Sequence, residues 1–161
     1  EEHGPGAVAE ALRRLNCAES CDRLITAGLS GALVPQLGRR DGVQLLRALC
    51  EKSLKPGPGC PAHKRVAEAL MSADGMKALV AQLAVKELGP WAAFALGHLC
   101  IRNPLAQVRA GRCQAIRSTV RLLSRAKDFQ QLDALEAGTY ALWNLLVGQP
   151  LARGDAQWEI E

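Results

Sequence analysis

Hydrophobic residues recur at intervals of three and four along most of this chain, which is the spacing of one face of an α-helix. Ile116, Val120 and Leu123 follow this spacing, for example. Two stretches, 91–101 and 137–147, are apolar on more than one side. A helix of that kind must lie between neighbours, as in the middle layer of a stack. The pattern therefore predicts an all-α fold.

One six-residue phrase occurs four times and aligns without gaps: Glu-Ala-Leu-Arg-Arg-Leu at 10–15, Gln-Leu-Leu-Arg-Ala-Leu at 44–49, Phe-Ala-Leu-Gly-His-Leu at 94–99 and Tyr-Ala-Leu-Trp-Asn-Leu at 140–145. The central leucines are Leu12, Leu46, Leu96 and Leu142, at intervals of 34, 50 and 46 residues. Self-similarity at about 40 residues, with three helices in each period, indicates a helical solenoid.

The phrases and the breaks between them predict a helical-repeat domain over 1–148. It would contain a partial repeat at 7–16, full repeats at 17–53, 62–102 and 104–148, and a C-terminal tail at 149–161. The expected helices are 18–27, 31–38 and 42–52 in the first full repeat, 62–73, 75–85 and 90–102 in the second, and a short turn at 104–110 with helices at 113–126 and 130–147 in the third.

Glycine and proline mark the expected boundaries. Gly28, Gly75 and Gly111 each follow an amphipathic stretch, where glycine suits a helix C-cap and a tight turn. The stretch 54–61 is expected to be a loop because its prolines and glycines cannot continue a helix. Pro35 should kink or shorten the helix predicted at 31–38.

The order of glycine turn, second helix and third helix resembles that of armadillo repeats, over about 7–148. The family's second helix reads apolar-x-x-Leu-Val-x-Leu-Leu after an Ala/Glu-Gly turn, which is similar to the stretches after Ala27-Gly28, Asp74-Gly75 and Ala110-Gly111. Its third helix reads Ala-x-Trp-Ala-Leu-x-Asn-Leu, and Tyr140 to Leu145 is the best match. The resemblance implies a right-handed α-solenoid of about three and a part repeats. HEAT repeats would change this architecture little.

In importin-alpha and beta-catenin, third helices line a concave groove in which asparagines hold a peptide backbone and tryptophans stack on side chains. The corresponding residues here are, for the asparagine, Arg14, Ala48, His98 and Asn144, and, for the tryptophan, Glu10, Gln44, Phe94 and Tyr140. Only Asn144 matches, so binding of nuclear signals by that mechanism is not expected.

A shorter patch remains. Phe94, His98, Tyr140 and Asn144 should lie close together on adjacent third helices, where an aromatic wall with polar donors would grip an extended peptide. The alternative is that Phe94 and Tyr140 only cap the core. Trp91 and Trp143 lie in the same two helices. They are either packing residues, which is the commoner outcome, or interface anchors.

Arginines recur every four residues at Arg117, Arg121 and Arg125, with Arg109 and Arg112 nearby. This basic stripe would meet a phosphate or an acidic partner, or would simply be a solvated convex face. Binding of phosphate or nucleic acid through the stripe is therefore an alternative function. Nucleic acid is the less favoured partner, because the net charge of +4 is modest and no aromatic residue interleaves with the stripe.

The chain has six cysteines but no quartet of Cys and His with metal-ligand spacing, so no metal site is expected. Cys17 and Cys21 share a helical face without further ligands. On an ideal helix Cys100 points about 200° away from His98, so no catalytic dyad is expected either. Cysteines among apolar residues indicate a reducing compartment, most simply the cytoplasm, although an organelle stays open.

The longest apolar stretches are about 12 residues, too short for the roughly 20 that span a bilayer. A chain that begins with glutamate is expected to be processed or trimmed. The sequence as a whole predicts a non-enzymatic protein–protein interaction module, or a structural subunit of a larger assembly, that binds a protein or peptide through its third helices and needs no cofactor. A HEAT-like lyase or chaperone, which would need a reactive thiol, is the enzymatic alternative.

Overall fold

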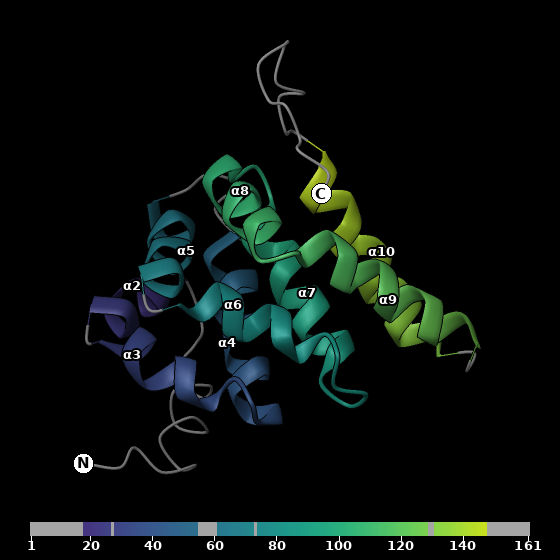
Figure 1. Ribbon diagram of the computed structural model, residues 1–161. Coiled ribbons are helices and arrows are strands. Elements are labelled where there is room, and N and C mark those ends of the chain that lie inside the picture. Colours follow the sequence, from purple (N-terminus) through teal and green to yellow (C-terminus); the bar gives the residue numbers. More distant parts are fainter. Residues whose placement is uncertain (1–17, 27, 55–60, 73, 129–130, 148–161) are drawn as a thin grey trace.

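The computed structural model describes residues 18–26, 28–54, 61–72, 74–128 and 131–147, and within these ranges it is built of helices without strands (Figure 1). The elements are α2 (Ala18–Thr26), α3 (Leu29–Leu33), the 3₁₀-helix η1 (Val34–Gln36), α4 (Arg40–Leu54), α5 (Pro61–Ser72), α6 (Gly75–Gln82), α7 (Gly89–Cys100), α8 (Pro104–Arg112), α9 (Ala115–Asp128) and α10 (Leu132–Leu146). The predicted all-α class is confirmed for these residues. The expected partial repeat at 7–16 and the tail at 149–161 lie outside them.

One expectation about a helix is confirmed and another is wrong. Pro35 does break the first repeat's second helix, because α3 ends at Leu33 and the chain continues as the 3₁₀-helix η1. The short turn expected at 104–110 is instead the nine-residue helix α8. It is stabilised at its start by Asn103, whose Oδ1 accepts a hydrogen bond from the Ala106 N–H at 3.1 Å, and by Pro104 in the first turn.

The three glycine turns were only partly predicted. Gly28 has φ +83°, as a C-cap glycine should. In the other two turns the left-handed residue is Asp74 (φ 54°) or Gln114 (φ 59°). Gly75 begins α6 for another reason: a Cβ there would lie 2.5 Å from a methyl carbon of Leu70. Gly111 lies inside α8, so its assignment as a turn was wrong.

Helices at equivalent positions in the predicted repeats are neighbours in space. The third helices α4, α7 and α10 pack side by side, α5 packs against both α2 and α8, and α6 packs against α9 (Figure 1). The central leucines Leu46 and Leu96 of the repeated phrase are fully buried. Burying each such side chain contributes roughly 1.5–3 kcal/mol to folding.

Buried polar side chains of the first helices tie the ends of the third helices together. Gln107 of α8 is 1% exposed, and its Nε2 lies 3.1, 2.9 and 3.0 Å from the carbonyl oxygens of Cys100, Asn144 and Val147. These acceptors belong to the C-terminal ends of α7 and α10, which have carbonyls without partners inside their own helices. Gln107 therefore fixes how far one third helix slides along the other.

His63 has the equivalent role one repeat earlier. It is buried in α5, its Nδ1 lies 3.4 Å from Ser53 Oγ at the end of α4, and the backbone of Leu99 near the end of α7 favours its protonated form. Burial lowers the pKa of His63 to about 4, and the charge of His98 lowers it further against the effect of the Leu99 backbone. At neutral pH this link is therefore made by a neutral imidazole.

None of the helices in the described ranges combines the length and the apolar character needed to cross a membrane.

Candidate partner-binding surface

Helix α7 turns three side chains to one side. Trp91, Phe94 and His98 follow one another at three and four residues, and all three are partly exposed. The opposite sides of α7 carry mostly alanine and leucine, including Ala92 and Leu96, which are buried against neighbouring helices. The sequence of α7 therefore places its large aromatic rings on the face that the other helices leave open.

Two arginines of α4 lie over these rings. The Arg47 guanidinium carbon is 4.6 Å from the ring centre of Phe94 and 5.1 Å from that of Trp91, and Arg40 is 5.6 Å from Trp91. Such cation–π contacts contribute about 0.5–1 kcal/mol each when exposed. The Nε of Arg47 is buried and has no hydrogen-bond partner among the described residues.

Tyr140 of α10 completes the row on the other side of α7. Its ring centre lies 5.8 Å from that of Phe94 and 5.1 Å from that of His98, and its hydroxyl is 2.8 Å from His98 Nδ1. Asn144, one turn further along α10, donates from Nδ2 to the Tyr140 carbonyl at 2.9 Å. The structure thus brings together the four residues that the sequence placed side by side. We call Arg40, Arg47, Trp91, Phe94 and Tyr140 the third-helix surface.

The polar groups of this patch are engaged with one another. Burial lowers the pKa of His98, with Arg47 acting in the same direction and Glu51 against it. Burial also raises the pKa of Tyr140. At neutral pH a neutral imidazole therefore shares a hydrogen bond with the tyrosine hydroxyl at Nδ1. The Asn144 amide, one of the groups expected to grip a peptide, donates inside the protein, to the Tyr140 carbonyl.

Arg40 and Arg47 are the residues of this surface that sequence reasoning missed. The family pattern directed attention to Gln44 and Ala48 on the same helix. The seven-residue spacing of the two arginines, two helical turns, was the available signal that they share one face. It could not show that the face lies against Trp91.

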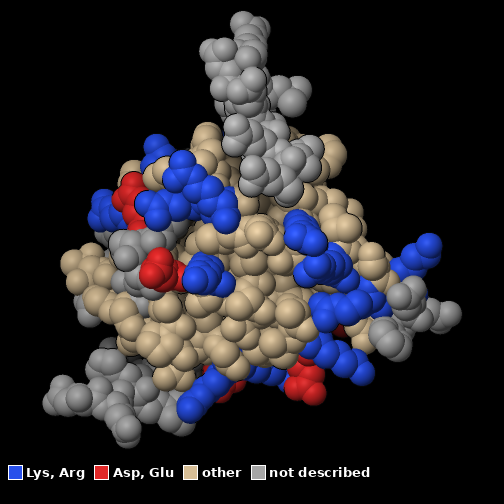
Figure 2. Space-filling model, in the orientation of Figure 1, with Lys and Arg blue, Asp and Glu red and all other residues tan. Residues whose placement is uncertain are grey.

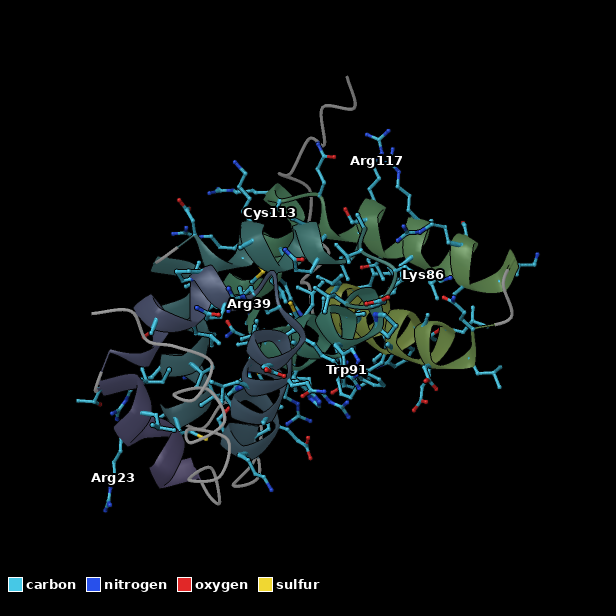
Figure 3. The ribbon with its side chains drawn as sticks, turned by 90° about the horizontal axis from the view of Figure 1, so that it is seen from below. Arg23, Arg39, Lys86, Trp91, Cys113 and Arg117 are labelled. Atoms are coloured by element: carbon cyan, nitrogen blue, oxygen red, sulfur yellow. The ribbon has the colours of Figure 1, made fainter. Side chains whose placement is uncertain are left out.

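The two tryptophans have different surroundings. Trp91 is half-buried under the arginines on the lower side of the molecule in Figure 3. Trp143 is 65% exposed on α10, so the interpretation of this side chain as core packing was wrong. Its position on α10 equals that of Gly97 on α7, which explains the difference: α10 covers Gly97, and none of the described helices covers Trp143.

The basic stripe is a real feature of the surface, with one exception. Arg109 and Arg112 of α8 and Arg117 and Arg121 of α9 are exposed, and Figure 2 shows a row of Lys and Arg side chains along α9. Arg125 instead binds the end of α6, donating to the carbonyl oxygens of Leu83 at 2.7 Å and Ala84 at 2.8 Å. A shallow hollow of about 400 Å³ lies beside it, lined by Ala84, Ser118, Arg121, Ser124 and Arg125.

Two of the described cysteines, Cys50 and Cys100, are buried thiols. Burial raises the pKa of Cys100 to about 12 and that of Cys50 well above its ordinary value, so both thiols stay protonated at neutral pH. No group of three His, Cys, Asp or Glu side chains with metal-binding geometry occurs among the residues that the structure describes. Cys17 and Cys60 lie outside these residues.

Comparison with known proteins gives a fold neighbour and no family. No family model matches the chain, and no curated protein matches it. The chain is similar to the crystal structure of an engineered protein from the Northeast Structural Genomics Consortium, with a TM-score of 0.72 and 19% sequence identity. The alignment covers 87% of this chain and 55% of the engineered one, so this chain spans about half the length of its neighbour. At this identity the similarity concerns the fold alone.

Proposed function

We propose that the chain is an armadillo-like helical-repeat module without enzymatic activity, which binds an acidic segment of a protein partner on the third-helix surface. The segment would lie across α4, α7 and α10, with a carboxylate at Arg47. The module would act alone or as a subunit of a larger assembly.

The observation that carries this proposal is the pair of guanidinium groups held over aromatic rings. Arg47 is positioned by both Phe94 and Trp91, so little side-chain entropy is lost when it binds a ligand. A guanidinium binds a carboxylate through two parallel hydrogen bonds, and an aromatic ring beneath it provides flat apolar contact for the rest of the segment. Partly exposed tryptophan, tyrosine and arginine are also the residue types that dominate binding energy at protein interfaces.

The repeat assignment has separate support. Three successive triplets of helices occur in the described residues; the first helices pack against each other and the third helices do the same from one triplet to the next, and the second helices α6 and α9 are also in contact. Packing of equivalent helices from repeat to repeat is typical of solenoids, whose repeats bury a continuous core by stacking. Third helices packed side by side would form the extended surface on which an elongated segment lies.

Selection from a library of random displayed peptides tests the binding proposal and requires no identified partner. We expect enrichment of peptides rich in Asp and Glu. Arg47→Gln should weaken a selected peptide by about tenfold or more, because it removes a charge-assisted pair of hydrogen bonds. Trp91→Ala should also weaken it.

Arg23→Gln is the matched control, because Arg23 is an exposed arginine on α2, outside the third-helix surface. It should bind as the wild type does. Circular dichroism of each variant verifies that it is folded. The proposal fails if no acidic peptide is enriched, or if Arg47→Gln and Arg23→Gln bind equally well.

A further inference from the structure

Each inner third helix has one face that the next third helix covers. On α7 this face contains Ala93, Gly97 and Cys100, all buried. A Cβ on Gly97 would lie 2.6 Å from the Tyr140 ring of α10, so the two helices are in close contact there. On α4 the equivalent residues are Val43 and Cys50, which are buried, and Arg47, which lies against the α7 rings.

No helix in the described part of the chain covers the same face of α10. Its equivalent residues are Thr139, Trp143 and Leu146, with Trp143 65% and Leu146 51% exposed. Leu132 at the start of the helix is 76% exposed. A shallow groove of about 690 Å³ runs along this face, lined by Leu132, Leu135, Glu136, Thr139, Tyr140 and Trp143. Among the described residues, the face that is covered on α4 and on α7 is therefore uncovered and largely apolar on α10.

The charges on α10 indicate what would cover it. Among the residues that line the groove the charged one is Glu136, which is exposed, and α10 has no Lys or Arg. A carboxylate beside an apolar groove favours a partner with basic residues beside its apolar stripe. Trp143 adds to this preference, because an indole face attracts a cation, as Trp91 does with Arg40 and Arg47.

We propose that the open face of α10, formed by Leu132, Leu135, Thr139, Trp143 and Leu146, is an end-stacking site for a basic amphipathic helix of a partner protein. The helix packs along α10 as α10 packs along α7, with its apolar stripe on the leucines and a Lys or Arg against Trp143 and Glu136. This inference rests on the continuation of helix stacking and does not depend on an acidic segment binding the third-helix surface.

Two synthetic helical peptides of 15 residues, the length of α10, test the site. Both have the same leucine stripe, flanked by Lys and Arg in one and by Glu in the other. Labelled peptide and fluorescence anisotropy give the affinity. We expect the basic peptide to bind at least about tenfold more tightly than the acidic one, a difference that shrinks at high salt.

Variants then locate the site. Trp143→Ala and Glu136→Lys should each weaken the basic peptide by about tenfold. Val120→Ala, an exposed apolar residue on α9, is the matched control and should change nothing. Arg47→Gln should also leave this binding unchanged, which separates failure here from failure of the acidic-segment proposal.

Three results would overturn the inference. The two peptides bind equally well, or the basic peptide binds Trp143→Ala as tightly as it binds the wild type. In the third, the chain associates with itself in the absence of peptide, and Trp143→Ala abolishes this association. The last would mean that a second copy covers the face. Sedimentation equilibrium of the wild type and of Trp143→Ala distinguishes it from peptide binding. Because Trp143 is exposed, its loss should leave the fold intact, and circular dichroism verifies this.

Discussion

His63 shows how one buried side chain makes stability depend on pH. Its pKa is about 4 in the folded protein and about 6.5 in the unfolded chain. Between these values the unfolded chain binds a proton that the folded protein does not, so stability falls as pH falls through this window. We expect the free energy of unfolding to drop by about 2 kcal/mol from pH 7 to pH 5, measured by urea denaturation.

His63→Gln is the test of that assignment. Glutamine keeps hydrogen-bonding groups at the position but does not titrate, so the drop between pH 7 and pH 5 should become smaller. His98, whose pKa is also lowered by burial, contributes in the same direction and accounts for part of the remainder. An unchanged pH dependence in His63→Gln would contradict the assignment.

Single residues were the hardest scale to predict from the sequence. Asn144 fits the family pattern, yet its amide donates to its own helix. Gln107 fits no motif, yet it links the ends of two helices. A side chain's hydrogen-bond partner depends on the neighbouring helix and on how far the two helices slide past each other, and neither is contained in a local pattern.

At the scale of elements, Arg125 holds the end of α6 against α9. Helix C-termini have unsatisfied carbonyls, and Arg125 donates to two of them, Leu83 and Ala84. Arg125→Gln should therefore lower the free energy of unfolding by about 1 kcal/mol in chemical denaturation. Arg121→Gln, one turn earlier on the same helix and exposed, should change it by less than about 0.5 kcal/mol. Equal effects would mean that the Arg125 hydrogen bonds do not stabilise the fold.

Gly97 sets the closest approach of α7 and α10. A Cβ there would meet the Tyr140 ring at 2.6 Å and the Ala141 backbone at 3.2 Å. Alanine gains about 1 kcal/mol of helix propensity, but overpacking costs about 1–3 kcal/mol, so Gly97→Ala should be destabilising on balance. Gly111→Ala in α8, where a Cβ would meet nothing within 4 Å, should be neutral or stabilising. Thermal unfolding of both variants checks this, and a more stable Gly97→Ala would contradict it.

Helices were predicted well because their signals are local. Pro61 and Pro104 occupy first-turn positions, and the predicted start of α5 lies one residue from the observed one. The error at α8 also has a local cause: Asn103 before Pro104 is a helix N-cap signal, and it outweighs the glycine at Gly111. Glycine near the end of a helix was treated as its stop, although the chain at Gly111 has ordinary helical conformation.

At the scale of the whole molecule, the repeated phrase predicted which helices would be neighbours. Leu46 and Leu96 mark α4 and α7, which pack against each other, and α7 also packs against α10. Which face of each helix stays open could not be predicted, since Trp143 and Gly97 occupy the same place in the phrase. The difference between them is that α10 covers Gly97 while none of the described helices covers Trp143, and this depends on the packing of the helices and not on the phrase.

The two charged surfaces of the molecule should act independently. Figure 3 places Arg117 on the upper side and Trp91 on the lower side, so the α9 row and the third-helix surface face different ways. Reversing Arg117 and Arg121 to Glu should therefore reduce salt-sensitive retention on heparin, a polyanion, because it removes two cationic contacts to that polyanion. The same variant should keep its affinity for an acidic peptide selected on the third-helix surface.

Arg47→Gln should behave in the opposite way, with normal heparin retention and weakened peptide binding. The reciprocal design matters because the net charge of +4 alone would draw any acidic ligand weakly to the whole protein. If charge reversal on α9 weakened the peptide as much as Arg47→Gln does, long-range attraction would explain the binding. If only Arg47→Gln weakens the peptide, the peptide contacts Arg47 directly. Salt at ordinary concentration screens charges beyond roughly 10 Å, so the arginines of α9 do not act on a peptide bound at the third-helix surface.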